Sequence, residues 1–168
     1  MGHDILILAE HLEGKLAPST FELVAKGREL AAQSGGVLKA ALLGHNAGSL
    51  AQGLAGYGLE VLLVDDPALA EYTDGGYEQT AVALLEGHAP RVLLVAHTAQ
   101  GYDVAPGIAG LANLPLVTNA VDIRLEGDKL VATRRLLNEK IQGEFDIASD
   151  KTFVVTLRPG TVKPAEPA

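Results

Sequence analysis

Short, almost wholly apolar runs recur along the chain, and they constrain its fold more than any other feature. Residues 4–10 (DILILAE), 37–44 (VLKAALLG), 60–66 (EVLLVDD) and 91–96 (RVLLVA) have this character, and a shorter run follows at 116–118. A strand of a parallel sheet is buried on both faces, so it lacks the alternation of apolar and polar residues that marks a half-exposed strand. These runs therefore predict a mostly parallel sheet.

The interval between the first two strands has the pattern of an amphipathic helix. Ser19 and Glu22 have the spacing of a capping box, and Gly35 and Gly36 supply a stop. Small and apolar residues recur every three or four positions, which predicts one helix face on the sheet. The predicted inner face comprises Thr20, Leu23, Val24, Gly27, Leu30 and Ala31, and the predicted outer face comprises Glu22, Lys26, Glu29 and Gln33.

Further helices are expected between the remaining strands. Residues 48–58 form a short one rich in small residues, and residues 75–88 form another that Asp74 is expected to cap. The last helix is expected to take Asp103 as its N-cap and to close at Asn113. Strands that alternate with helices in this way predict an α/β fold.

The pattern changes after the fifth strand. Residues 121–125 alternate apolar and polar side chains, EGDK follows as a tight turn, and LVATRRL returns, which predicts an antiparallel hairpin. Residues 144–147 and 152–157 continue in strand character. We expect all of these to be short antiparallel strands at the carboxy-terminal end of the domain.

Length and composition fit a single domain. The chain has 168 residues, of which 48% are hydrophobic and 20% are charged, enough for one full core. We expect an α/β domain over residues 1–160. Residues 161–168 contain two prolines and no apolar pattern, which is typical of a Pro-rich tail or linker.

Charge and residue usage exclude several classes of partner and site. The formal net charge is -8 and no run of Lys or Arg forms a basic patch, so nucleic acid is not expected as a partner. The chain has no cysteine, which excludes disulfides, thiolate metal sites and Cys nucleophiles. No apolar run approaches the roughly 18 residues that a membrane span needs. We therefore expect a cytoplasmic protein without membrane insertion.

The loop after the fourth strand is the best candidate for a ligand site. Thr98, Gln100, Gly101 and Asp103 lie between the carboxyl end of a strand and a helix N-terminus, where open α/β sheets bind ligands. The same residues also suit a structural connection in which Thr98 and Asp103 satisfy backbone amides. Both interpretations stay open at the level of the sequence.

Other motifs indicate no catalytic or metal residues. GLAGYG at residues 53–58 follows a helix and precedes a strand, the reverse of a dinucleotide fingerprint, so it reads as a helix stop. Asp65 and Asp66 stand before Pro67, which favours a turn or cap over a ligand role. No nucleophile, base and orienting group can be assembled, so we do not expect an enzyme.

Three stretches, in order, resemble the amino-terminal domain of the electron transfer flavoprotein α subunit. They are ILILAEHLEGKLAPSTFELVAKGRELA near the start, AHTAQGYDVAPGIAGLANLPLVTNAVDI in the middle and VVTLRPG near the end. The AEH...GKL opening favours the α subunit over its β relative. After Arg134 and Arg135 the family commonly has a glycine-rich turn, whereas this chain has LLNEKIQG.

The resemblance implies a three-layer α/β fold of the adenine nucleotide α-hydrolase-like type, finished by antiparallel strands. It implies a scaffold that packs against a β subunit and supports a separate FAD domain, which carries electrons from dehydrogenases of fatty acid oxidation and related pathways. FAD would belong to that assembly, and we do not expect this chain to hold it alone. The related β subunit holds AMP in this fold, but the α domain generally does not. AMP is therefore not expected here. If this chain did bind a nucleotide, the candidate contacts would be Thr98, Gln100, Gly101 and Asp103.

A second class of function stays open. Universal stress proteins share the general fold and bind adenine nucleotides as free-standing modules, usually with a glycine-rich loop that ends in Gly followed by Ser or Thr. The chain has Gly160 before Thr161 but lacks the preceding glycines. If the scaffold interpretation is right, the uncovered antiparallel strands should recruit a partner, and the isolated chain should form a homodimer.

Overall fold

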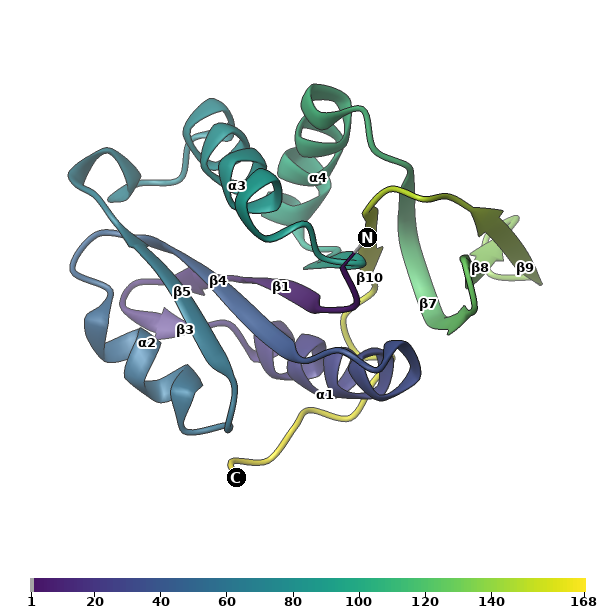
Figure 1. Cartoon of the computed structure of the whole chain (residues 1–168), viewed down its shortest axis with the longest axis horizontal. Coiled ribbons are helices and arrows are strands. Elements are labelled where there is room, and N and C mark those ends of the chain that lie inside the picture. Colours follow the sequence, from purple (N-terminus) through teal and green to yellow (C-terminus); the bar gives the residue numbers. More distant parts are fainter. Residues whose placement is uncertain (1) are drawn as a thin grey trace.

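A computed structural model describes residues 2–168 and contains a large sheet in the strand order β5-β4-β1-β6-β10-β7-β8-β9 (Figure 1). A small ribbon pairs β2 with β3. The strands are β1 (Ile5–Ala9), β2 (His11–Leu12), β3 (Lys15–Leu16), β4 (Leu38–Gly44), β5 (Glu60–Asp65), β6 (Val92–Ala96), β7 (Leu116–Glu126), β8 (Lys129–Leu136), β9 (Ile141–Ala148) and β10 (Phe153–Leu157).

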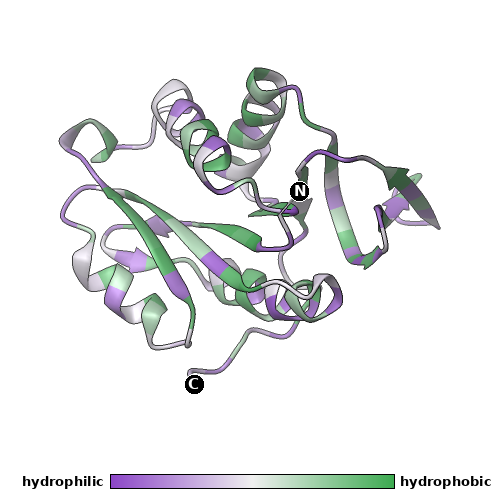
Figure 2. Cartoon of the chain, in the orientation of Figure 1, coloured by the Kyte–Doolittle hydropathy of each residue, from purple (hydrophilic) through white to green (hydrophobic). Residues whose placement is uncertain are grey.

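Helices cover both faces of the sheet, which confirms the predicted three-layer α/β fold (Figure 1). One apolar cluster joins one sheet face to α1 and α2, and a second joins the other face to α3 and α4. The strands between the helix layers are largely hydrophobic (Figure 2). The helices are α1 (Pro18–Ser34), α2 (Gly48–Ala55), the 3-10 helix η1 (Pro67–Leu69), α3 (Asp74–His88) and α4 (Ala99–Ala112).

The last strand occupies a different place from the expected one. β10 lies between β6 and β7 and is parallel to both, so the prediction that residues 152–157 are antiparallel was wrong. The physical reason is burial on both faces, since every residue of Phe153–Leu157 is buried. Arg91 helps to bring the chain back to this position, because its guanidinium donates to the carbonyl oxygens of Asp128, Ser149 and Lys151.

β7 is one strand of 11 residues where two separate strands were expected. Its first part is parallel to β10 and its second part is antiparallel to β8. The change of partner falls at an irregular register near Asn119, which has a φ of 56°. The antiparallel arrangement of β7, β8 and β9 agrees with the predicted hairpin and its continuation.

α1 differs from its prediction at its start and on its outer face. Its N-cap is Ala17, which makes no side-chain cap, so Ser19 and Glu22 do not form a capping box. Glu22 accepts instead from the backbone N–H of Gly160 at 2.8 Å. The left-handed Gly35, with a φ of 71°, ends the helix as expected.

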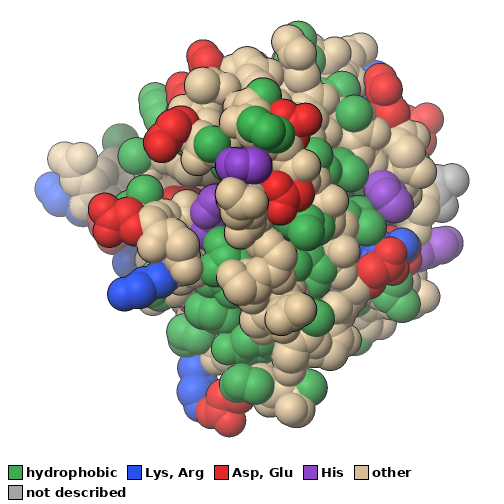
Figure 3. Space-filling view, turned by 90° about the vertical axis from the view of Figure 1, so that its left-hand side faces the viewer, with side chains coloured by type: hydrophobic (Ala, Val, Ile, Leu, Met, Phe, Trp, Pro, Cys, Tyr) green, Lys and Arg blue, Asp and Glu red, His purple; other side chains and the backbone are tan. Residues whose placement is uncertain are grey.

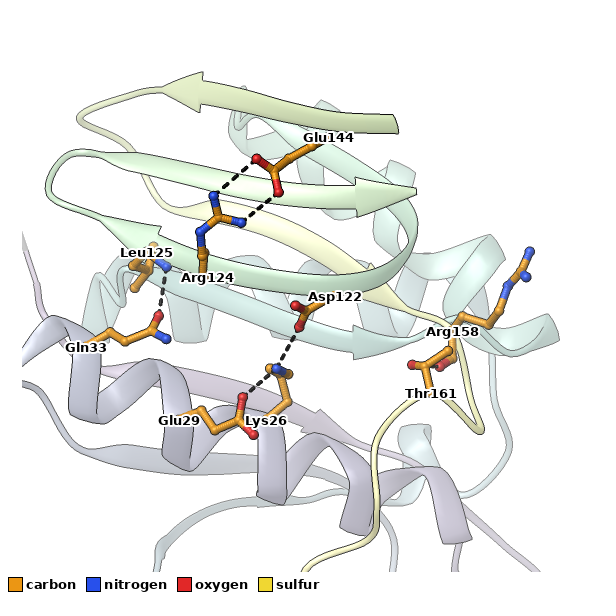
Figure 4. A network of polar contacts seen from close by, with 9 residues as sticks. All are labelled: Lys26, Glu29, Gln33, Asp122, Arg124, Leu125, Glu144, Arg158 and Thr161. Atoms are coloured by element: carbon orange, nitrogen blue, oxygen red, sulfur yellow. Dashed lines mark hydrogen bonds and ion pairs between the residues drawn. The ribbon is translucent and has the colours of Figure 1, made fainter. Parts of the chain in front are cut away.

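Two residues of the predicted outer face of α1 are buried. Glu22 and Lys26 are 9% and 6% exposed, because the segment after β10 and the bend of β7 lie across this part of the helix. Lys26 Nζ donates to Asp122 Oδ1 at 2.8 Å and also to Glu29 (Figure 4). Burial alone would lower the pKa of Lys26, but these two carboxylates raise it above its usual value. Glu29 and Gln33 are exposed as predicted.

Two helix caps also differ from prediction. Thr73, and not Asp74, is the N-cap of α3, and Asp74 lies in the first turn, where it accepts from Gly75 N at 2.8 Å. α4 starts at Ala99 with Thr98 as its N-cap, so Asp103 lies inside the helix and does not cap it. Asn113, with a φ of 51°, closes α4 as expected.

Residues 161–168 run along α1 toward the end of α2 (Figure 1). The backbone N–H of Ala165 donates to Phe21 O at 2.9 Å, and that of Ala168 donates to Gly56 O at 3.1 Å. The division between a domain at residues 1–160 and a tail or linker at 161–168 stays a prediction. No helix within residues 2–168 combines the length and the apolar character that a membrane crossing requires.

Candidate functional site at the carboxyl edge of the sheet

The order of the parallel strands places one crevice where α/β sheets usually bind ligands. The chain passes outward from β1 to β4 and β5, and β6 then lies on the other side of β1. The reversal creates a switch point between the carboxyl ends of β1 and β6. Glu10 follows β1 there, and the predicted loop follows β6.

Three of the four predicted site residues meet at this crevice. Thr98 Oγ1 accepts from Gly101 N at 3.1 Å and donates to Glu10 Oε2 at 2.6 Å. A Cβ on Gly101 would stand 1.7 Å from the carbonyl oxygen of Ala96, so glycine is needed for the close approach of α4 to β6. Gln100 lines the crevice beside Glu10 and Gly101.

Asp103 lies apart from the other three. Its carboxylate accepts from the Tyr72 hydroxyl at 2.7 Å and thereby ties α4 to the segment before α3. Burial is the main cause that raises the pKa of Tyr72, and the hydrogen bond to Asp103 adds to it. The structure therefore brings Thr98, Gln100 and Gly101 together, whereas Asp103 joins α4 to the segment before α3.

The crevice is a poor fit for the phosphate of AMP or for the pyrophosphate of FAD. The hydroxyl of Thr98, the N-cap of α4, already donates to Glu10 Oε2. The Glu10 carboxylate therefore lies at the end of the helix that would attract a phosphate. The crevice leaves no room for a water molecule, whereas ligand pockets have volumes of roughly 300–1,000 Å³. As ligand contacts, Thr98, Gln100, Gly101 and Asp103 stay a prediction.

A second group of polar residues at the same edge was missed by the sequence analysis. His97 Nδ1 lies 2.9 Å from Thr156 Oγ1, which accepts from Asn119 N at 2.8 Å. Arg158 Nε donates to Asn119 Oδ1 at 3.0 Å. Burial lowers the pKa of His97, and the charges of Arg158 and Arg134 lower it further.

The sequence carried one signal for this group. His97 directly follows β6 and Arg158 directly follows β10, and the carboxyl ends of parallel strands meet at one edge. That signal required β10 to be recognised as a parallel strand next to β6, which the sequence analysis did not do.

The remaining candidates have structural contacts. Asp65 accepts from Asn46 N at 2.9 Å and Ala47 N at 3.0 Å, and these two bonds are the main cause that lowers its pKa. Asp66 caps η1 by accepting from Ala68 N at 2.8 Å, in agreement with the turn interpretation. Within residues 2–168 no three His, Asp or Glu side chains are placed to hold a metal ion.

The surface near β5 and α2 carries no basic patch. On the face shown in Figure 3, the Lys and Arg side chains of the described residues lie toward the outline, while Asp and Glu side chains are distributed across the face. This distribution agrees with the formal net charge of -8, and this face offers a phosphate backbone no basic patch.

The outer strand β9 presents an uncovered surface. In the strand order of the described chain it pairs with β8 and forms the end of the sheet. Leu137 is 70% exposed, Ile141 50% and Phe145 43%. We call the surface formed by these three residues the β9 edge. Exposed strand edges with apolar side chains are typical places for another chain to bind.

Comparison with known proteins identifies the family. The family model described as electron transfer flavoprotein domain matches residues 5–168. The electron transfer flavoprotein subunit alpha of Bacillus subtilis (strain 168) is 34% identical over 167 residues, which are 99% of this chain and 50% of that protein. The subunit alpha of Methylophilus methylotrophus is 29% identical over 164 residues, 98% of this chain and 51% of that protein.

A relative with another name matches less of the chain. The acryloyl-CoA reductase electron transfer subunit beta of Anaerotignum propionicum is 33% identical over 129 residues, 76% of this chain and 35% of that protein. The chain spans about half the length of the two subunit alpha relatives. Together with the α/β fold, these matches mean that the chain belongs to the electron transfer flavoprotein family.

Proposed function

We propose that the chain acts as an α-subunit-type scaffold domain, which assembles with a β subunit and supports an FAD-holding domain during electron transfer from dehydrogenases. The β9 edge is the observation that carries this proposal, because it offers a partner both unpaired backbone and exposed apolar side chains. FAD supplies the redox chemistry in such an assembly. This chain would contribute a docking surface, with residues 2–160 as the folded body and residues 161–168 as a connecting segment.

The poor fit of the switch-point crevice to a phosphate supports a scaffold over a nucleotide-binding module. At the other glycine considered for a phosphate loop, the backbone N–H of Gly160 donates to Glu22 Oε2. A module of the universal stress type would need free donors for phosphate at Thr98 and Gly160. Here the Thr98 hydroxyl donates to Glu10 and the Gly160 N–H donates to Glu22.

Co-expression with the β subunit encoded in the same genome tests the proposal. We expect the tagged chain to retain the β subunit in a one-to-one complex, measured by size-exclusion chromatography with light scattering. We also expect the chain alone to lack the flavin absorbance near about 450 nm, because the family resemblance assigns FAD to a separate domain of the assembly. The scaffold role would be contradicted if a folded β subunit does not bind the chain, or if the chain alone is purified with stoichiometric FAD.

A further inference from the structure

Arg134 is a half-buried cation for which residues 2–168 provide no counter-ion. Its Nε atom is buried and has no hydrogen-bond partner in the described chain. The next residue, Arg135, is exposed and pairs with Glu139 at 3.0 Å. Because a buried charge loses hydration, an unpaired one normally weakens a fold. Of these two adjacent arginines of β8, only Arg135 has an ion-pair partner within the described chain.

Arg134 lines a groove that a partner can reach from the open edge of the sheet. The groove has a volume of about 270 Å³, and its other walls are largely apolar. In the register of β8 with β9, Arg134 stands opposite Gly143, which has no side chain of its own, and the Phe145 ring of β9 lies beside that glycine. The lining residues besides Arg134 are Leu116, Val117, Phe145, Asp146 and Ile147.

The groove offers one cation without an ion pair among the described residues, Arg134. Asp146 also lines it, but the carboxylate of Asp146 accepts from Lys129 Nζ at 2.9 Å. A phosphate is normally held by several donors, such as backbone amides or clustered arginines, and the groove lacks such a set. One guanidinium among aliphatic and aromatic side chains instead suits a carboxylate with apolar neighbours.

The groove is continuous with the β9 edge, since Phe145 belongs to both. We propose that Arg134 anchors an acidic side chain of the partner subunit, which packs its flanking apolar residues against the β9 edge. The inference rests on the proposed function, because the partner is the β subunit of that assembly. Arginine in a desolvated pocket surrounded by apolar contacts is a frequent centre of binding energy in protein interfaces.

The electrostatic surroundings favour the same ligand. The charges of Arg134 and Arg158 both act on His97 and add to the effect of burial in lowering its pKa, so two cations lie near this end of the sheet, and of the two Arg158 pairs with Glu139. The formal net charge of the chain is -8, so an arginine without an ion pair in the described part of the chain, such as Arg134, is a local exception. Opposite charge at a docking surface directs a partner to the correct register.

Arg134→Met and Arg135→Met form a matched pair for the test. The affinity of the β subunit for each chain is measured by calorimetry, and the Tm of each isolated chain is measured in parallel. We expect R134M to bind at least about tenfold more weakly while its Tm is unchanged or higher, since a half-buried arginine whose Nε has no partner within residues 2–168 is removed. We expect R135M to bind within about twofold of the native chain, because an exposed ion pair contributes little. R134K should recover part of the lost affinity.

Four outcomes would overturn the inference, and they are distinguishable. If the native chain binds the β subunit and R134M binds equally well, the inference fails while the proposed function stands. If the native chain does not bind at all, both fail. A lower Tm of R134M together with weaker binding would indicate a structural role. Inorganic phosphate that raises the Tm of the native chain and not of R134M would assign the groove to small anions.

Discussion

At the scale of single residues, His97 connects the protonation of the chain to its stability. Burial and the charges of Arg158 and Arg134 lower its pKa in the folded chain, so the unfolded chain binds a proton more readily. The free energy of unfolding should therefore fall as the pH drops below the unfolded value of about 6.5, with a slope of at most about 1.4 kcal/mol per pH unit. The free energy of unfolding, measured by urea unfolding between about pH 5 and 8, should depend less steeply on pH for His97→Gln than for the native chain. His88→Gln, whose side chain is exposed, controls for the loss of an imidazole, and an unchanged slope in H97Q would refute this account.

At the scale of elements, the junction of β1, β6 and α4 determines whether the switch-point crevice binds a nucleotide. Glu10 and Thr98 satisfy each other there, and Gly101 brings α4 against the end of β6. Calorimetric titration with AMP and with ATP should therefore give no binding heat, since a phosphate would have to displace the Glu10 carboxylate. Saturable heat with a Kd below about 1 mM that is lost in Thr98→Val would restore the nucleotide-binding interpretation.

At the scale of the whole molecule, the exposed end of the sheet should govern association. The β9 edge has no covering element among the described residues, so the isolated chain should self-associate, most simply as a symmetric dimer. Light scattering across a dilution series should show this dimer, and Phe145→Glu should shift it toward monomer because the substitution places a charge in the apolar surface. The exposed Leu111→Glu, on α4 away from β9, is the control. A strict monomer at high micromolar concentration that also fails to bind a β subunit would exclude the scaffold role.

Local patterns in the sequence determined most elements of this protein. The apolar runs predicted the parallel strands, because complete burial requires nearly continuous apolar residues. Gly35 and Asn113 marked helix ends, since a left-handed residue favours glycine or asparagine. The family resemblance also lay in the sequence, in ordered stretches that span most of the chain.

Only the tertiary structure decided which segments meet across the chain. The run at residues 153–157 is apolar whether its neighbours are parallel or antiparallel, so its insertion between β6 and β7 depended on the return path that Arg91 holds. Glu22 and Lys26 follow a solvent-facing helical pattern, yet distant segments cover them and supply their partners. The sequence likewise could not show that Arg134 Nε lacks a partner in the described chain. Whether a charged side chain finds a partner depends on residues remote in sequence, and their positions are fixed only when the whole sheet forms.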